Sequence, residues 1–251
     1  MISKRVLALF ILSFMLALLA LAPASILAPG LDYATRGRLT LANTSGTVWS
    51  GAGTISLRQS EQRLVALQDM HWKLLIPALF SGKIQAQLQW GSAPPAVPSE
   101  ITADMQQTVL RNLLLQLPAR LFEEISPMLK PAQFRGQLQV QADQLVFTKR
   151  GIDGVANIDW QQASSALSSI SPLGNYHLVL SGAGENVNIV LTTTTGILLL
   201  EGQGVWSAVR GLEFHGKARA APGSNAQLNE LLHHLGREEA PGVYGFNLVP
   251  Q

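Results

Sequence analysis

Apolar and polar side chains alternate along several segments of the chain beyond residue 30. In the run 84–90, apolar residues at the even positions are separated by glutamines at the odd ones. The same period of two recurs at 134–142, 176–180 and 244–248. Such alternation is typical of strands that bury one face and expose the other. Because parallel strands buried on both faces carry unbroken apolar runs, the pattern predicts an antiparallel sheet.

Glycine-containing turn signals separate these strands, and one proline-rich stretch interrupts them. That stretch, residues 93–98, is the clearest linker. It predicts that a β-rich domain over 29–251 consists of two parts, about 31–92 and 99–251. The turn signals lie at 45–46, 81–82, 150–151, 182–184, 195–196 and 240–242.

Helical spacing of apolar residues occurs in only a few places, which predicts a mainly β fold with a few short helices. One helix is predicted where Leu228, Leu231, Leu232 and Leu235 share a face, with Gly236 as a left-handed cap. Two more are predicted on either side of Pro118, over the apolar positions Val109, Leu110, Leu113, Leu114 and Leu117, and then Leu121, Phe122 and Ile125.

Two segments of the chain resemble each other, around 69–88 and 157–180. Each has a strand that ends in tryptophan, an excursion that holds a proline, and a returning strand. Short β units align easily by chance, so an internal duplication stays open. Tryptophans are predicted to be the main packing anchors, mostly buried on strands, because each can bury about 200 Å². They are Trp49, Trp72, Trp90, Trp160 and Trp206.

The N-terminus has a different pattern, because it is apolar on all sides. Lys4 and Arg5 precede an apolar run, and the next charge is Asp32. A charge-free stretch of this length is enough to cross a bilayer as a helix. The pattern predicts a cytoplasmic tip over 1–5 and a transmembrane anchor over 6–28. The cations before the span place the N-terminus in the cytoplasm and the remainder beyond the membrane.

A cleaved signal peptide is the alternative interpretation of this N-terminus. Ala20 and Ala22 form a small-x-small site, and Ala22 and Ala24 form a second. Pro23 would follow a cut at the first site directly, which disfavours it. The apolar run is also long for a signal core, so an uncleaved anchor is the preferred interpretation.

Charge and composition exclude several classes of function. The chain has 18 basic and 16 acidic residues, a formal net charge of +2, and no clustered basic face for nucleic acid. It has no cysteine, which excludes disulfides and thiolate metal sites. The five histidines include no His-x-His or His-x-x-x-His spacing for a metal. No serine lies in a Gly-x-Ser-x-Gly elbow, and no glycine-rich loop leads into a helix. We therefore predict no enzyme activity, cofactor or metal.

Several short motifs occur in a distinctive order along the chain. They include Gly-Thr-Val-Trp-Ser-Gly at 46–51, Phe-Arg-Gly at 134–136 and Ser-Pro-Leu-Gly at 171–174. With the apolar N-terminus, they resemble protein N of the type II secretion system over nearly the whole chain. The positions that carry the resemblance, expected to be structural, are Gly46, Trp49, Gly51, Trp72, Gly136, Pro172, Gly174, Tyr176, Gly204, Trp206 and Gly216.

The resemblance implies a single-pass inner-membrane protein with a periplasmic β domain that assists the export of folded proteins. It implies other type II secretion components as partners, either the inner-membrane platform or the secretin, and it carries over no catalytic residues. It also implies a curved, incompletely closed sheet. The alternative is a periplasmic module that handles lipid or another apolar ligand. That alternative loses its site if Leu113, Leu114, Leu117 and the leucine face of 228–235 fill the concavity.

Overall fold

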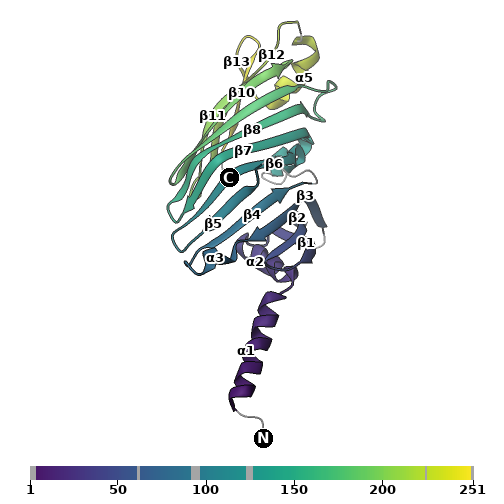
Figure 1. The fold of residues 1–251 in the computed structure, drawn as a ribbon. Helices are drawn as coiled ribbons and strands as arrows, with labels where there is room; N and C mark the ends of the chain where they lie inside the picture. Colours follow the sequence, from purple (N-terminus) through teal and green to yellow (C-terminus); the bar gives the residue numbers. More distant parts are fainter. Residues whose placement is uncertain (1–3, 61–62, 92–96, 123–126, 224, 250–251) are drawn as a thin grey trace. The chain divides into compact units, whose positions relative to one another are not determined.

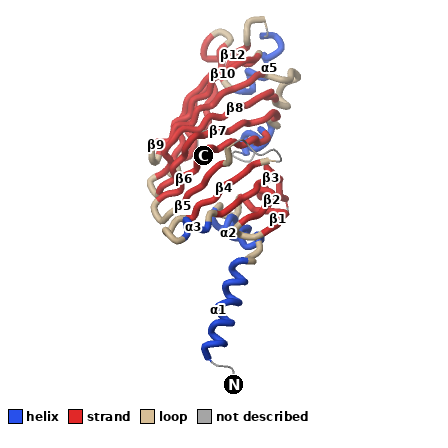
Figure 2. The backbone as a smooth tube through the Cα atoms, in the orientation of Figure 1, coloured by secondary structure: helices blue, strands red, loops and turns tan. Residues whose placement is uncertain are grey.

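The computed structural model describes residues 4–60, 63–91, 97–122, 127–223 and 225–249. The chain divides into two compact units, Met1–Pro98 and Ser99–Gln251, and each is described by itself. Antiparallel strands dominate both units (Figures 1 and 2), so the predicted mainly β class is confirmed.

In the first unit, a helical N-terminal segment precedes four strands. The strands pair in chain order, each antiparallel to the next. The elements are α1 (Lys4–Ala20), the 3-10 helix η1 (Ala24–Ile26), α2 (Leu27–Ala34), β1 (Leu39–Gly46), β2 (Ser50–Ser60), β3 (Arg63–Leu74), α3 (Ile76–Leu79) and β4 (Ile84–Trp90).

The second unit is a longer meander in which only the last two strands exchange places, with β14 between β12 and β13. Its elements are β5 (Ser99–Ala103), β6 (Gln107–Pro118), the 3-10 helices η2 (Ala119–Leu121) and η3 (Pro127–Ala132), β7 (Arg135–Thr148), β8 (Gly151–Ser164), β9 (Gly174–Ala183), β10 (Asn186–Gly196), β11 (Leu198–Ser207), β12 (Gly211–Ala220), α5 (Asn225–Leu235), β13 (Arg237–Ala240) and β14 (Val243–Leu248).

Glycines in the left-handed region form several of the connections between neighbouring strands. Gly151 (φ +136°) is the first residue of β8, directly after the turn from β7, Gly184 (φ +66°) lies between β9 and β10, and Gly242 (φ +72°) lies between β13 and β14. A residue with a Cβ rarely adopts such angles. The turn signals predicted at these places are therefore turns in the structure.

The predicted leucine helix is α5, and it covers part of the sheet in the second unit. Leu228, Leu231 and Leu232 are buried against strand residues that include Leu198. The left-handed cap predicted at Gly236 is wrong, since its φ lies outside the left-handed region. Gly236 is required for another reason: a Cβ there would overlap the backbone carbonyl of a glycine on β14.

The helix predicted over Val109 to Leu117 is also wrong, because this run forms β6. Leu113, Leu115 and Leu117 lie directly opposite residues of β7. The run has apolar residues at both odd and even positions, so it satisfies the helical and the strand templates alike. Pairing with β7 decides between them. After Pro118, the described residues form the 3-10 turn η2 followed by one α-helical residue, Phe122, and Ile125 lies outside the described residues.

The tryptophan prediction holds for some positions and fails for others. Trp72 on β3 is 4% exposed, and Trp90 and Trp160 are half-buried on strands. Trp49 is half-buried but lies in the turn between β1 and β2. Trp206 is 38% exposed, so its predicted burial is wrong. The reason is its position: α5 packs against the first residues of β11, and Trp206 lies near the other end.

The apolar N-terminal stretch is divided among three helical segments. The first, α1, ends at Ala20, and Pro23 then adopts an extended conformation before η1. Proline lacks the N–H that would continue the helix, which accounts for the break. Ala24 is 1% exposed, and the start of α2 packs with it against Trp72. Among the described residues, no helix combines the length and the apolar character needed to span a bilayer.

Candidate functional site

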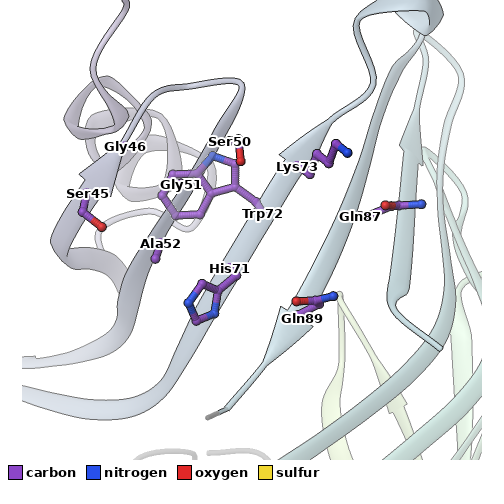
Figure 3. A pocket seen from close by; sticks show the side chains of 10 residues that line it. All are labelled: Ser45, Gly46, Ser50, Gly51, Ala52, His71, Trp72, Lys73, Gln87 and Gln89. Carbon is purple, nitrogen blue, oxygen red and sulfur yellow. The ribbon is translucent and has the colours of Figure 1, made fainter. Parts of the chain in front are cut away.

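A groove of about 400 Å³ lies in the described surface of the first unit. It lies over β1, β2, β3 and β4 (Figure 3), and three of the positions that carry the family resemblance line it. Its lining residues are Ser45, Gly46, Ser50, Gly51, Ala52, His71, Trp72, Lys73, Gln87 and Gln89.

The floor of the groove is the Trp72 indole, packed on Gly51. These two residues are direct partners across β2 and β3, and Figure 3 shows the ring extending toward Gly51. A Cβ on Gly51 would lie 2.6 Å from Cζ2 of Trp72 and 2.5 Å from the carbonyl oxygen of Ser45. The indole N–H donates to the carbonyl of Val48 at 3.1 Å. Glycine at 51 therefore makes room for a buried ring whose polar atom is satisfied.

One end of the groove is the β1–β2 turn, which also holds the C-terminal end of α1. The Trp49 indole N–H donates to the carbonyl of Leu19 at 2.8 Å. The Val48 amide donates to the carbonyl of Ala22 at 2.9 Å. Gly46 enters this turn with φ +84°. The bond from Trp49 pairs a carbonyl in the last turn of α1, where carbonyls have no amide partner within the helix.

The rim of the groove is polar and mostly exposed. His71 lies opposite Gln89, and Lys73 lies opposite Gln87, across β3 and β4. Lys73 is the only formally charged side chain among the ten that line the groove. Amide, hydroxyl and ammonium groups of this kind can hydrogen-bond an extended polar segment. Within the described part of the chain, no cluster of three or more histidine, aspartate or glutamate side chains suits a metal ion.

The second unit contains a related arrangement around Trp160 on β8. Its indole N–H donates to the carbonyl of Arg135 at 3.0 Å. Gly136 (φ +109°) lies beneath it, and a Cβ there would come within 2.9 Å of the indole nitrogen. Instead of aliphatic residues, the rings of Phe122 and Phe134 pack edge-on against Trp160, with centroids 5.2 and 5.3 Å away.

Tyr176 on β9 completes this aromatic cluster. Its ring centroid is 5.6 Å from that of Trp160, and its hydroxyl donates to the carbonyl of Leu198 at 3.0 Å. Burial raises the pKa of the Tyr176 hydroxyl above its ordinary value. Gly174 is close by, since a Cβ there would lie 3.2 Å from the tyrosine oxygen. Pro172 precedes this strand after a cis peptide bond and is exposed.

The remaining positions of the resemblance lie farther along the second unit. Phe214 covers Gly204, because a Cβ on this glycine would lie 2.7 Å from its ring. The ring of Phe246 covers Gly216 in the same way. Trp206 does not join either pair by an interaction that the structure records. Most of the resemblance positions thus fall into separate aromatic–glycine packing sites.

Sequence reasoning missed the polar side of the groove. Alternation along 84–90 was sufficient to place Gln87 and Gln89 on a polar face. It did not indicate that His71 and Lys73 lie opposite them, because that depends on the register between β3 and β4. It also missed Phe214 and Phe246 as the rings that cover glycines in neighbouring strands.

Comparisons with known proteins agree with one another. A model of the family described as type II secretion system (T2SS), protein N, matches residues 37–247. A protein of Klebsiella pneumoniae named type II secretion system protein N is 29% identical over 234 residues, which cover 90% of this chain and 86% of that protein. No solved structure matches the chain.

Proposed function

We propose that this chain, which belongs to the protein N family of the type II secretion system, is an accessory component of that secretion machine. Its role is to assist the assembly or the coupling of the envelope-spanning apparatus that exports folded proteins. Binding to other secretion components, and not catalysis, is its activity. The partners we propose are the inner-membrane platform, the secretin, or both.

The proposed location is the inner membrane, with a single anchor, a cytoplasmic N-terminus and periplasmic β units. Apolar side chains of α1 support an apolar environment for this helix. Phe10 is 69% exposed, Leu9 is 66% exposed and Met15 is 59% exposed. A helix that is apolar on every side is unfavourable in water and suited to lipid. Lys4 and Arg5 at its start favour the cytoplasm for that end.

The observation that carries the proposal is the attachment of α1 to the β1–β2 turn. Leu19 and Ala22 supply carbonyls that accept bonds from Trp49 and Val48. Cleavage after Ala22 would remove both acceptors, and the Trp49 N–H would lose its partner. An intact N-terminal helix therefore suits the folded first unit better than a removed signal peptide does.

The orientation is tested by a reporter that is active only in the periplasm, fused after Gln251 of the full chain. We expect activity from this fusion and none from the same reporter fused before Met1. Activity in the cytoplasm would contradict the proposed location. A mature N-terminus at Pro23 or Ser25, determined on the purified protein, would show that the apolar stretch is a signal peptide.

The secretion role is tested by deleting the chain from a cell that exports a folded protein by this system. We expect the exported protein to accumulate in the periplasm, and the full chain to restore export. A chain in which a cleavable signal sequence replaces residues 1–22 should restore export poorly at equal abundance. An anchored copy has a higher effective concentration beside its partners than a dissolved one. Normal export without the chain would contradict the accessory role.

One observation favours a second candidate, the apolar-ligand module. Val140, Ile158, Leu178 and Leu191 form a row across four strands of the second unit, each directly opposite the next. All four side chains are only half-buried. A row of this kind is an apolar strip on which an acyl chain can lie.

This candidate requires that the leucines of α5 and β6 do not fill the space for a ligand, and these leucines differ in their burial. On α5, Leu228, Leu231 and Leu232 are buried, which removes any ligand site beneath that helix. On β6, Leu113 is buried, whereas Leu114 is 36% exposed. Lipid extraction from the purified full chain tests the strip. Leu178→Glu should abolish co-purified lipid, and Val190→Glu, at an exposed position on the other face of β10, should not.

A further inference from the structure

The connection between β3 and β4 exposes a group of large apolar side chains. Phe80 is 91% exposed, Ile84 is 54% exposed, Ile76 is 47% exposed and Leu79 is 36% exposed. We refer to residues 75–84 as the α3 loop. None of the four residues of α3 is buried, so the loop does not fold its apolar side chains into the unit.

The α3 loop lies at the end of the first unit at which α1 terminates. Trp49 bonds to the end of α1 through its side chain, and its carbonyl accepts the amide of Leu74 at 2.7 Å. Leu74 is the last residue of β3, and the next amide, that of Leu75, donates to Gln85 on β4. Figure 1 shows α3 at the end of the strands from which α1 extends. If α1 lies in a membrane, the surface of that membrane is therefore close to the α3 loop.

The backbone of the α3 loop is hydrogen-bonded within the loop itself. The amides of Gly82 and Lys83 donate to the carbonyls of Leu79 and Ala78, at 3.0 and 3.1 Å. The hydroxyl of Ser81 donates to the carbonyl of Ala78 at 2.8 Å. Polar backbone groups that are satisfied internally are a requirement for entering an apolar layer. The amides of Gly82 and Lys83 are paired in this way, which lowers the cost of entering such a layer, and the loop presents its large apolar side chains outward.

The charge of the loop favours a lipid surface over other occupants. Lys83 is its one charged residue, it is exposed, and no acidic residue lies between 75 and 84. Anionic phospholipid headgroups attract a cation next to an apolar segment. An aromatic side chain such as Phe80 and a lysine that extends toward the headgroups are a common combination at membrane interfaces.

We propose that the α3 loop is a second membrane contact of this chain, with Leu79 and Phe80 inserted among the lipids beside α1 and Lys83 at the headgroups. The inference rests on the proposed anchoring of α1. A single helix allows the β unit to rotate and tilt about its attachment. A second contact fixes the orientation of β1–β4 relative to the bilayer, and so determines which face of this unit the partners meet.

Because the chain has no native cysteine, a single introduced cysteine can be labelled specifically. Phe80→Cys in the full chain is labelled with an environment-sensitive fluorophore and reconstituted into vesicles of phosphatidylethanolamine and phosphatidylglycerol. Leu64→Cys is the matched control, because Leu64 is 50% exposed near the opposite end of β3, about 30 Å from Leu74. We expect a blue shift and quenching by nitroxide-labelled lipids for the probe at 80, and neither for the probe at 64.

The outcomes separate this inference from the anchoring proposal. A protein that floats with the vesicles while the probe at 80 remains in water retains its anchor and overturns the loop contact. A protein that does not float at all overturns the anchor, and the loop contact with it. In a second measurement, Leu79→Asp in the Phe80→Cys chain should abolish the blue shift without changing flotation. An unchanged blue shift in that variant would also contradict the insertion of this loop.

Discussion

Trp72 in the first unit and Trp160 in the second are packed on the same principle but covered differently. Each lies on a strand, donates its indole N–H to a backbone carbonyl, at 3.1 and 3.0 Å, and packs on a glycine of the preceding strand. Glycine is required at both places because any Cβ would collide with the ring or with the neighbouring backbone.

The difference lies in what covers the two rings. Trp72 lies in a cluster with Ala24 and with residues of α2, so segments that follow α1 cover it. Trp160 is covered by aromatic rings that include Phe122 and Phe134, from the same unit. The comparison teaches that the first unit covers its tryptophan with the helical segment that precedes its strands, whereas the second unit covers its tryptophan with rings from the connection between β6 and β7.

The largest expected effect comes from removing the rings. Trp72→Ala should destabilise the first unit by about 3–5 kcal/mol, because a nearly fully buried side chain is lost. Trp160→Ala should cost less, since its ring is only half-buried. Hydrogen–deuterium exchange of the full chain measures both, with peptides from β2–β3 and from β7–β9 read separately. Wild-type protection in either variant would show that the ring does not contribute to packing and would suggest a partner-binding role.

A smaller effect is expected from adding one methyl group beneath each ring. Gly51→Ala should cost about 1–3 kcal/mol by overpacking against Trp72. Gly136→Ala should cost more, because backbone strain at φ +109° adds about 1–3 kcal/mol. Gly30→Ala is the control, since nothing lies within 4 Å of the added Cβ. Equal protection in all three variants would mean that the glycines are not packing positions.

The sequence was sufficient to predict most of the strands, but it was not sufficient to predict how side chains and helices pack on them. Alternation at 84–90 and 176–180 predicted β4 and β9, because a half-exposed strand imposes a period of two. It failed at β6, where apolar residues occupy both faces and the period is lost. It failed also at Trp206, whose exposure depends on where α5 packs along β11, a contact between residues far apart in the chain.

The groove also depends on contacts between residues far apart in the chain, which sequence patterns do not predict. The motif at 46–51 singled out Gly46 and Gly51, and the structure places both with Trp72 in the lining of the groove. The reason for glycine at 51 is a cross-strand contact, and it emerges only when the register of β2 on β3 is known. The attachment of Leu19 to Trp49 joins residues from segments that the sequence assigned to an anchor and to a β domain. Local patterns do not report such long-range bonds.

The smallest effect, and the sharpest test of the comparison, is the loss of one hydrogen bond from each ring. Trp72→Phe and Trp160→Phe retain an aromatic ring but leave the carbonyls of Val48 and Arg135 without the indole donor. A hydrogen bond of this kind contributes about 0.5–1.5 kcal/mol, and its loss costs more where the remaining group is buried. We expect a greater loss of protection for Trp72→Phe, because water reaches the half-buried Trp160 site more easily and can replace the donor. Hydrogen–deuterium exchange of both variants, measured in the same buffer, tests this expectation. A greater loss at Trp160 would mean that the aromatic cover shields its hydrogen bond better than the N-terminal segment shields the bond of Trp72.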